Sequence, residues 1–137
     1  MNKIIKCCIF TLIISLLFTI SACETKDYKE IEEVCYKINS IVKDKEFFIA
    51  KIKERRIVLY DNKYAQMSEL PLEHYNKGVD KIISIRKDGA NVYFIIGGSV
   101  DDENGIVFIN NELNAVLDGI NSIKRIGGNS YWYGSTR

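Results

Sequence analysis

The sequence has little of several things that usually assign a chain to a functional class. Its 137 residues include one proline, one histidine and nine glycines, which argues against intrinsic disorder and fibrous repeats. Nineteen basic residues balance eighteen acidic ones, so the chain lacks the basic surplus with which nucleic-acid binders neutralise phosphates. Hydrophobic residues are abundant, at 47% of the chain, and this is enough for one domain with a packed core.

The first 22 residues have the pattern of a signal peptide. Lys3 and Lys6 precede an uncharged, mostly apolar stretch over residues 7–22. This stretch is shorter than the roughly 20 apolar residues that a spanning helix needs, and small residues follow it, as at a signal-peptidase site. An uncleaved N-terminal anchor helix is the alternative.

The residues at the end of this segment favour a cleaved signal peptide over an uncleaved anchor helix. Ile20-Ser21-Ala22-Cys23 resembles the lipobox of bacterial membrane lipoproteins, in which an aliphatic and two small residues precede an obligatory cysteine. The resemblance implies cleavage before Cys23 and a diacylglyceryl group on its sulfur. Two or three acyl chains anchor a protein stably, where one is marginal. The implied partner is therefore the cell membrane, with the lipid-anchored domain on its extracytoplasmic side.

The remaining chain divides into a tether over residues 23–27 and one domain over residues 28–137. An amphipathic helix is predicted from about Lys26 to Lys43, with acidic residues in its first turns and lysines in its last. Cys35 is the one cysteine left for the domain, so no internal disulfide is expected, and it is interpreted as a small buried hydrophobe. The apolar positions at three- and four-residue spacing are Tyr28, Ile31, Cys35, Ile38 and Val42.

After residue 46 the pattern changes to short strands separated by turn-forming residues. The predicted strands cover residues 47–52, 56–60, 81–86, 91–96, 105–109, 114–117, 120–124 and 130–133.

Two blocks of this region repeat. Residues 82–94 align without gaps on residues 120–132, with six of thirteen positions identical, and residues 57–64 align upstream on residues 106–113. The fold class predicted is mainly β, with the helix followed by two tandem four-stranded antiparallel units. The first unit carries an insertion at about residues 68–79, which contains Pro71 and His74.

A tandem four-stranded unit is similar to a β-propeller blade, although two units fall short of the four that the smallest closed propellers use. Three arrangements are compatible with the pattern. The units pack as a sandwich or open barrel under the helix, which is the favoured one; they assemble with copies from other chains; or the chain is a shortened relative of a longer repeat protein.

The sequence offers few candidates for catalysis or for metal binding. Ser99 lacks the second glycine of a nucleophile elbow, and His74 has no second histidine or nearby cysteine with which to bind zinc. A Cys35–His74 dyad needs a helix-face thiol to meet an inserted loop. The acidic run at residues 101–105 misses calcium-loop spacing and is interpreted as a solvated hairpin loop. We expect no enzyme, metal site or cofactor.

Aromatic residues near the end of the chain are the candidate binding residues. Strand alternation places Tyr131 and Tyr133 on one face and Trp132 on the other, and the repeat brings Tyr93 and Phe94 into the corresponding positions. A platform of Tyr93, Tyr131 and Tyr133 would suit a protein or glycan partner. The same pattern also fits a core in which Phe94 and Trp132 are equivalent anchors.

These features predict a lipid-anchored, non-catalytic binding module of the bacterial envelope. The alternative is an accessory subunit or inhibitor of an envelope complex, which docks through the apolar face of the helix at residues 28–42.

Overall fold

The computed structural model describes residues 28–73, 75–98, 102–110 and 120–136. The predicted signal peptide, Cys23, His74, Ser99 and the predicted strand at residues 114–117 lie outside the described residues.

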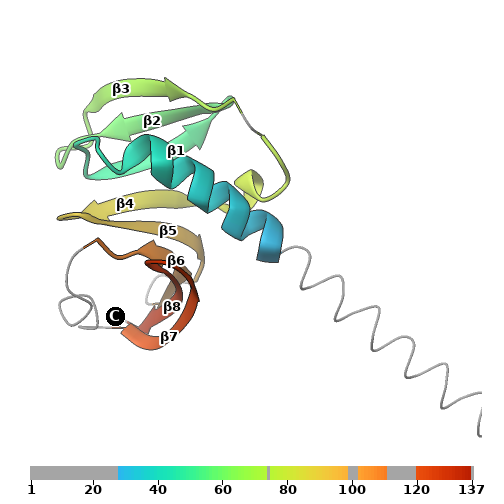
Figure 1. The fold of residues 1–137 in the computed structure, drawn as a ribbon. Helices are drawn as coiled ribbons and strands as arrows, with labels where there is room; N and C mark the ends of the chain where they lie inside the picture. The colour runs from blue at the N-terminus through green and yellow to red at the C-terminus, as the bar shows by residue number, and fades with distance from the viewer. Residues whose placement is uncertain (1–27, 74, 99–101, 111–119, 137) are drawn as a thin grey trace, which may run out of the picture.

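A helix and eight strands make up the described chain (Figure 1). The helix covers residues 28–42, where the apolar residues recur at helical spacing. A single 3-10 turn, η1, covers Val79–Lys81. The strands are β1 (Ile49–Lys53), β2 (Arg56–Tyr60), β3 (Gln66–Pro71), β4 (Ser84–Asp88), β5 (Asn91–Gly97), β6 (Asp102–Phe108), β7 (Ile120–Gly127) and β8 (Ser130–Thr136).

The strands form one open antiparallel sheet in the order β3-β2-β1-β4-β5-β6-β8-β7. The prediction of a mainly β fold is confirmed. The predicted insertion is partly a strand, because residues 66–71 form β3 at one edge of the sheet. The acidic run predicted as a solvated loop is also strand from Asp102 onward.

The predicted division into two four-stranded units is not confirmed. Hairpins β4–β5 and β7–β8 do correspond, and each turns at a glycine with positive φ, 58° at Gly89 and 55° at Gly128, a conformation that glycine adopts at little cost. The other aligned strands take different places, because β2 pairs with β1 and β3 whereas β6 pairs with β5 and β8. The copies therefore merge into one continuous sheet.

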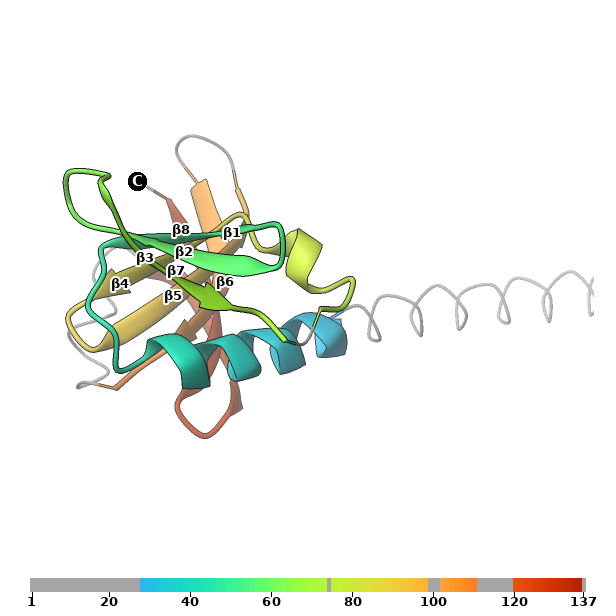
Figure 2. The ribbon, with the colours of Figure 1, turned by 90° about the horizontal axis from the view of Figure 1, so that it is seen from above.

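The sheet buries apolar residues on both of its faces. The helix lies across one face (Figures 1 and 2) and packs on alternate residues of the strands, such as Ile57, Ile85 and Phe94. Burying each such side chain contributes roughly 1.5–3 kcal/mol. A smaller second cluster on the opposite face contains Tyr93, Val107, Ile109 and Tyr133.

The pairing between neighbouring strands is shortest between β1 and β4, and we call this place the seam. Strands β1 and β4 share two paired positions, Ile49–Arg86 and Ala50–Ile85, whereas every other neighbouring pair shares at least five. The helix runs in front of this seam (Figure 1), and its cluster includes residues from both sides. The helix therefore joins a three-stranded and a five-stranded part of the sheet.

In the described part of the chain, no helix combines the length and the apolar character needed to cross a membrane.

Candidate functional site

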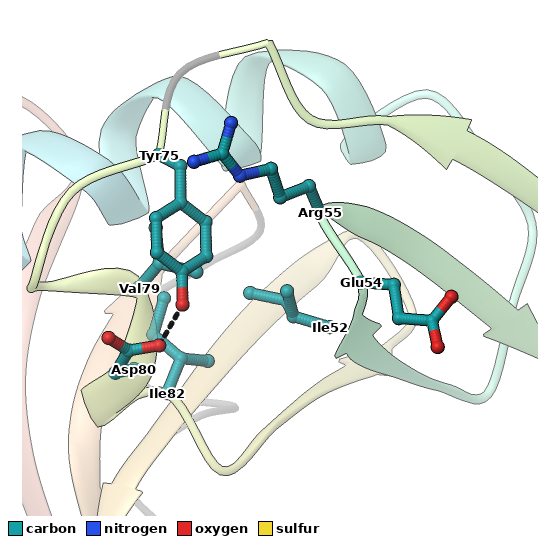
Figure 3. Close-up of a pocket in the computed structure, with 7 residues that line it drawn as sticks. All are labelled: Ile52, Glu54, Arg55, Tyr75, Val79, Asp80 and Ile82. Carbon is teal, nitrogen blue, oxygen red and sulfur yellow. Dashed lines mark hydrogen bonds between the residues drawn. The ribbon is translucent and has the colours of Figure 1, made fainter.

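A pocket of about 400 Å³ lies where the β1–β2 turn meets the connection from β3 to β4 (Figure 3). We call it the Arg55 pocket. Apolar side chains from β1 and from the connection lie beside charged groups from the turn and from η1. The lining residues are Ile52, Glu54, Arg55, Tyr75, Val79, Asp80 and Ile82.

The turn that supplies the charged groups has an unfavourable backbone conformation. Glu54 and Arg55 form a two-residue hairpin loop between the paired Lys53 and Arg56, and their φ angles are 47° and 62°. Asn-Gly is the usual sequence where both loop residues have positive φ. Residues with a Cβ are destabilised in this conformation by about 1 kcal/mol or more each. Such strain concentrates at functional sites.

Side chains and backbone hold Arg55 in one place. Its guanidinium carbon lies 5.2 Å from the centre of the Tyr75 ring, within the range of a cation–π contact. The Leu72 amide donates a hydrogen bond of 3.0 Å to the Arg55 carbonyl. Tyr75 in turn donates its hydroxyl proton to the Asp80 carboxylate, and this hydrogen bond raises the pKa of Tyr75.

The pocket has groups suited to recognition. Among the described side chains, none forms an ion pair with Arg55, and Figure 3 shows the Glu54 carboxylate pointing away from Tyr75. A guanidinium can take a carboxylate through two parallel hydrogen bonds, while Ile52 and Val79 offer an apolar surface. Arg55 is therefore the group of this pocket that could bind the carboxylate of a partly apolar ligand, while the Asp80 carboxylate of the same lining accepts the Tyr75 hydroxyl.

The predicted tyrosine platform is assembled but largely covered. The Tyr93 and Tyr133 rings meet edge to face at 5.6 Å, and these residues are 6% and 4% exposed. Tyr131 is half-buried beside them. The prediction that the three tyrosines share one face of the sheet is therefore correct. However, Tyr93 and Tyr133 belong to the second core cluster and offer little surface to a partner.

A polar network that the sequence did not indicate accompanies these tyrosines. The Tyr133 hydroxyl donates to Glu103 Oε1 at 2.6 Å, and Arg86 Nη2 donates to the same oxygen at 3.2 Å. Arg86 also stacks over the Tyr93 ring at 4.3 Å. Burial, followed by the hydrogen bond to Glu103, raises the pKa of Tyr133, and burial raises that of Tyr93. These contacts join β4, β5, β6 and β8 on the sheet face opposite the helix.

Two neighbouring basic residues of β4, Arg86 and Lys87, are covered to different degrees, and the Arg86 side chain is 29% exposed. The Lys87 side chain is 7% exposed, and its ammonium donates to the carbonyl oxygens of Lys43, at 3.0 Å, and Lys45. These carbonyls follow the carboxyl end of the helix, where a cation is favourable. Lys87 therefore fixes this end of the helix to β4.

The helix offers no free apolar stripe for docking. Ile31, Val34, Cys35, Ile38 and Val42 are all buried in the main core, so the docking face that the accessory-subunit hypothesis needs is occupied by the chain's own sheet. Burial raises the pKa of the Cys35 thiol, which agrees with its interpretation as a small hydrophobe.

A second hollow, of about 580 Å³, lies beside the first turn of the helix. We call it the helix-start pocket. Trp132 meets Tyr28 edge to face at 5.3 Å and donates its indole N–H to Glu32 at 2.7 Å. Unlike Phe94, which is fully buried, Trp132 is only partly covered, so the two are unequal anchors. The lining residues are Tyr28, Lys29, Glu32, Lys124, Arg125, Ile126 and Trp132.

The described residues contain no group of three or more potential metal ligands. Compared with protein-family models, curated proteins and solved structures, the chain shows no significant match.

Proposed function

We propose that the chain is a lipid-anchored module on the extracytoplasmic side of a bacterial membrane, where it binds a protein or glycan partner without catalysing a reaction. The observation that carries this proposal is the sequence from Lys3 to Cys23, in which a basic start, an uncharged stretch and a lipobox-like end follow in order. The described part of the domain begins at Tyr28, five positions after Cys23 in the sequence, so the link between the lipid and the domain is short.

The anchoring is tested by expressing the full chain in a bacterium that processes lipoproteins. We expect an intact mass that starts at Cys23 and includes added acyl groups, and we expect the product to partition into detergent. Cys23→Ala should abolish both properties, whereas Cys35→Ala, which changes a buried thiol, should keep them. A soluble product, or an uncleaved chain retained by its first 22 residues, would contradict the proposal.

The Arg55 pocket supports the binding part of the proposal. Its guanidinium lies against the Tyr75 ring at a strained turn, and apolar side chains line the same pocket. We propose an acidic peptide or an acidic glycan as the partner, because both carry carboxylates that a guanidinium binds well.

Binding is measured by calorimetry on the anchored chain in detergent, with tetraglutamate and a glucuronate-containing oligosaccharide as probes. Arg55→Gln should weaken the binding of a recognised probe about tenfold or more, which corresponds to the loss of one charge-assisted contact. Arg56→Gln is the matched control, because the neighbouring Arg56 is engaged by Glu69 at 2.9 Å. Equal binding by both variants, or binding of neither probe by the unmodified chain, would contradict this part.

A further inference from the structure

We propose that the helix-start pocket seats the domain on the headgroups of an anionic lipid bilayer. This inference rests on the proposed function, because the lipid on Cys23 brings the domain to the membrane. It goes further in assigning one particular surface of the domain to the bilayer.

The short tether restricts which surface can reach the membrane. Four residues lie between Cys23 and Tyr28 in the sequence, and the five residue steps from Cys23 to Tyr28 span at most about 18 Å when fully extended. The first turn of the helix therefore stays near the interface whatever the orientation of the domain. The helix-start pocket includes that first turn.

The side chains at the pocket suit an interface between water and lipid. Tyr28 is 51% exposed, and Trp132, against which it packs, is partly covered. Tyrosine and tryptophan concentrate at membrane interfaces, because an apolar ring and a polar group share one side chain. Lys29, Lys124 and Arg125 surround them as exposed residues, and basic side chains are attracted to anionic headgroups.

The acidic residues nearby are engaged or directed elsewhere. Glu32 is the one acidic residue of the lining and accepts the indole N–H of Trp132, which holds the carboxylate in place but does not remove its charge. Glu33 pairs with Lys37 at 2.7 Å. Glu30 lies about 200° around the helix from Tyr28, on the side where its backbone approaches Gly78. The lining of the helix-start pocket thus carries three basic residues against one acidic residue, although the charges of the whole chain nearly balance.

Trp132 gives a direct measurement, because it is the only tryptophan of the chain. The lipidated full chain is reconstituted into vesicles of phosphatidylcholine, with or without phosphatidylglycerol, that contain a lipid spin-labelled at its headgroup. We expect the label to quench Trp132 fluorescence more strongly when phosphatidylglycerol is present. High salt should reduce the difference, because it screens the attraction.

Variants identify the surface. Lys29→Gln and Lys124→Gln lie on separate elements, and each should lower the ratio of docked to undocked domain about fivefold, the effect of one basic residue near an anionic surface. Lys63→Gln is the matched control, because it changes the same charge in the β2–β3 loop, which lies far from the helix start (Figure 2). Its quenching should equal that of the unmodified chain.

The outcomes separate this inference from the proposed function. An acylated, vesicle-bound chain whose quenching ignores phosphatidylglycerol and both substitutions would overturn the docking surface and leave the anchoring intact. A chain that gains no lipid, yet binds phosphatidylglycerol vesicles with quenching sensitive to Lys124→Gln, would overturn the anchoring and support the surface. A chain with neither lipid nor quenching would overturn both.

Discussion

At the scale of single residues, Cys35 shows the effect of complete enclosure. Its thiol has no exposure, and burial, with the nearby charge of Glu32 second, raises its pKa. Nucleophilic chemistry needs the thiolate, so the folded environment keeps Cys35 inert.

This burial predicts a loss of stability at alkaline pH. An unfolded cysteine loses its proton near pH 8.5, whereas folded Cys35 keeps it. Above that pH the folded state binds more protons than the unfolded state, so the free energy of unfolding falls as pH rises, by up to about 1.4 kcal/mol per pH unit. Urea unfolding at pH 7.5 and pH 10 measures the loss. Cys35→Ala should lose less than the unmodified chain over this interval, and an equal loss would contradict the prediction.

The network around Glu103 predicts a second effect. Glu103→Ala leaves the Tyr133 hydroxyl and the Arg86 guanidinium without this acceptor, and the Glu103 side chain is only 11% exposed. We expect the free energy of unfolding to fall by about 2–3 kcal/mol, and by about 1 kcal/mol for Tyr133→Phe. Denaturant melts measure both changes. The control Glu69→Gln weakens an exposed ion pair and should lower the free energy of unfolding by less than about 1 kcal/mol. Equal losses in Glu103→Ala and Glu69→Gln would contradict a stabilising role of the network.

At the scale of elements, the β1–β2 turn predicts a gain in stability. Replacing Glu54 and Arg55 together by Asn and Gly supplies the residues that tolerate positive φ at both positions. We expect the free energy of unfolding to rise by about 1–2 kcal/mol, while the carboxylate binding proposed for Arg55 is lost. Thermal melts and calorimetry measure the two effects. A destabilised variant would indicate that contacts of the Glu54 and Arg55 side chains outweigh the backbone strain.

Elements with a local signal could be predicted from the sequence. The helix spacing matches residues 28–42, and the β4–β5 and β7–β8 hairpins have glycine turns between alternating segments. Strand β3 gave no such signal, because five of its six residues are exposed and alternation arises only where one face is buried. Glu54 and Arg55 likewise have no turn-forming sequence, so the Arg55 pocket was missed.

Features that depend on pairing between strands far apart in the sequence could not be predicted from local sequence patterns. Alternation correctly grouped Tyr93, Tyr131 and Tyr133 on one face. Their burial depends on a second core cluster that draws on β5, β6 and β8, and strand order is not contained in the period of any one strand. The same limit explains why two similar sequence blocks were taken for two separate units.

At the scale of the whole molecule, the helix compensates for the narrow seam between β1 and β4. Ile38 is fully buried at the centre of the helix stripe. Ile38→Ala should lower the free energy of unfolding by about 2–4 kcal/mol. Because the helix joins the two parts of the sheet, this substitution should also speed amide exchange in β1 and β4 more than in β8, which hydrogen exchange measures strand by strand. Tyr36→Ala, at an exposed site of the same helix, is the control. Uniform acceleration across all strands would contradict a special role at the seam.

The hydrogen bond between Glu32 and Trp132 joins residues that are 100 positions apart, and this separation has a consequence for folding kinetics. The helix leaves the ribosome long before β8, so its first turn must wait for almost the whole domain before it meets its partner. A contact between residues so far apart forms late, because the entropy of closing the intervening chain is lost before the contact is made. Since export would deliver the helix first, its apolar stripe would remain uncovered for most of translocation, and we expect the native state to form only after the last strand has crossed.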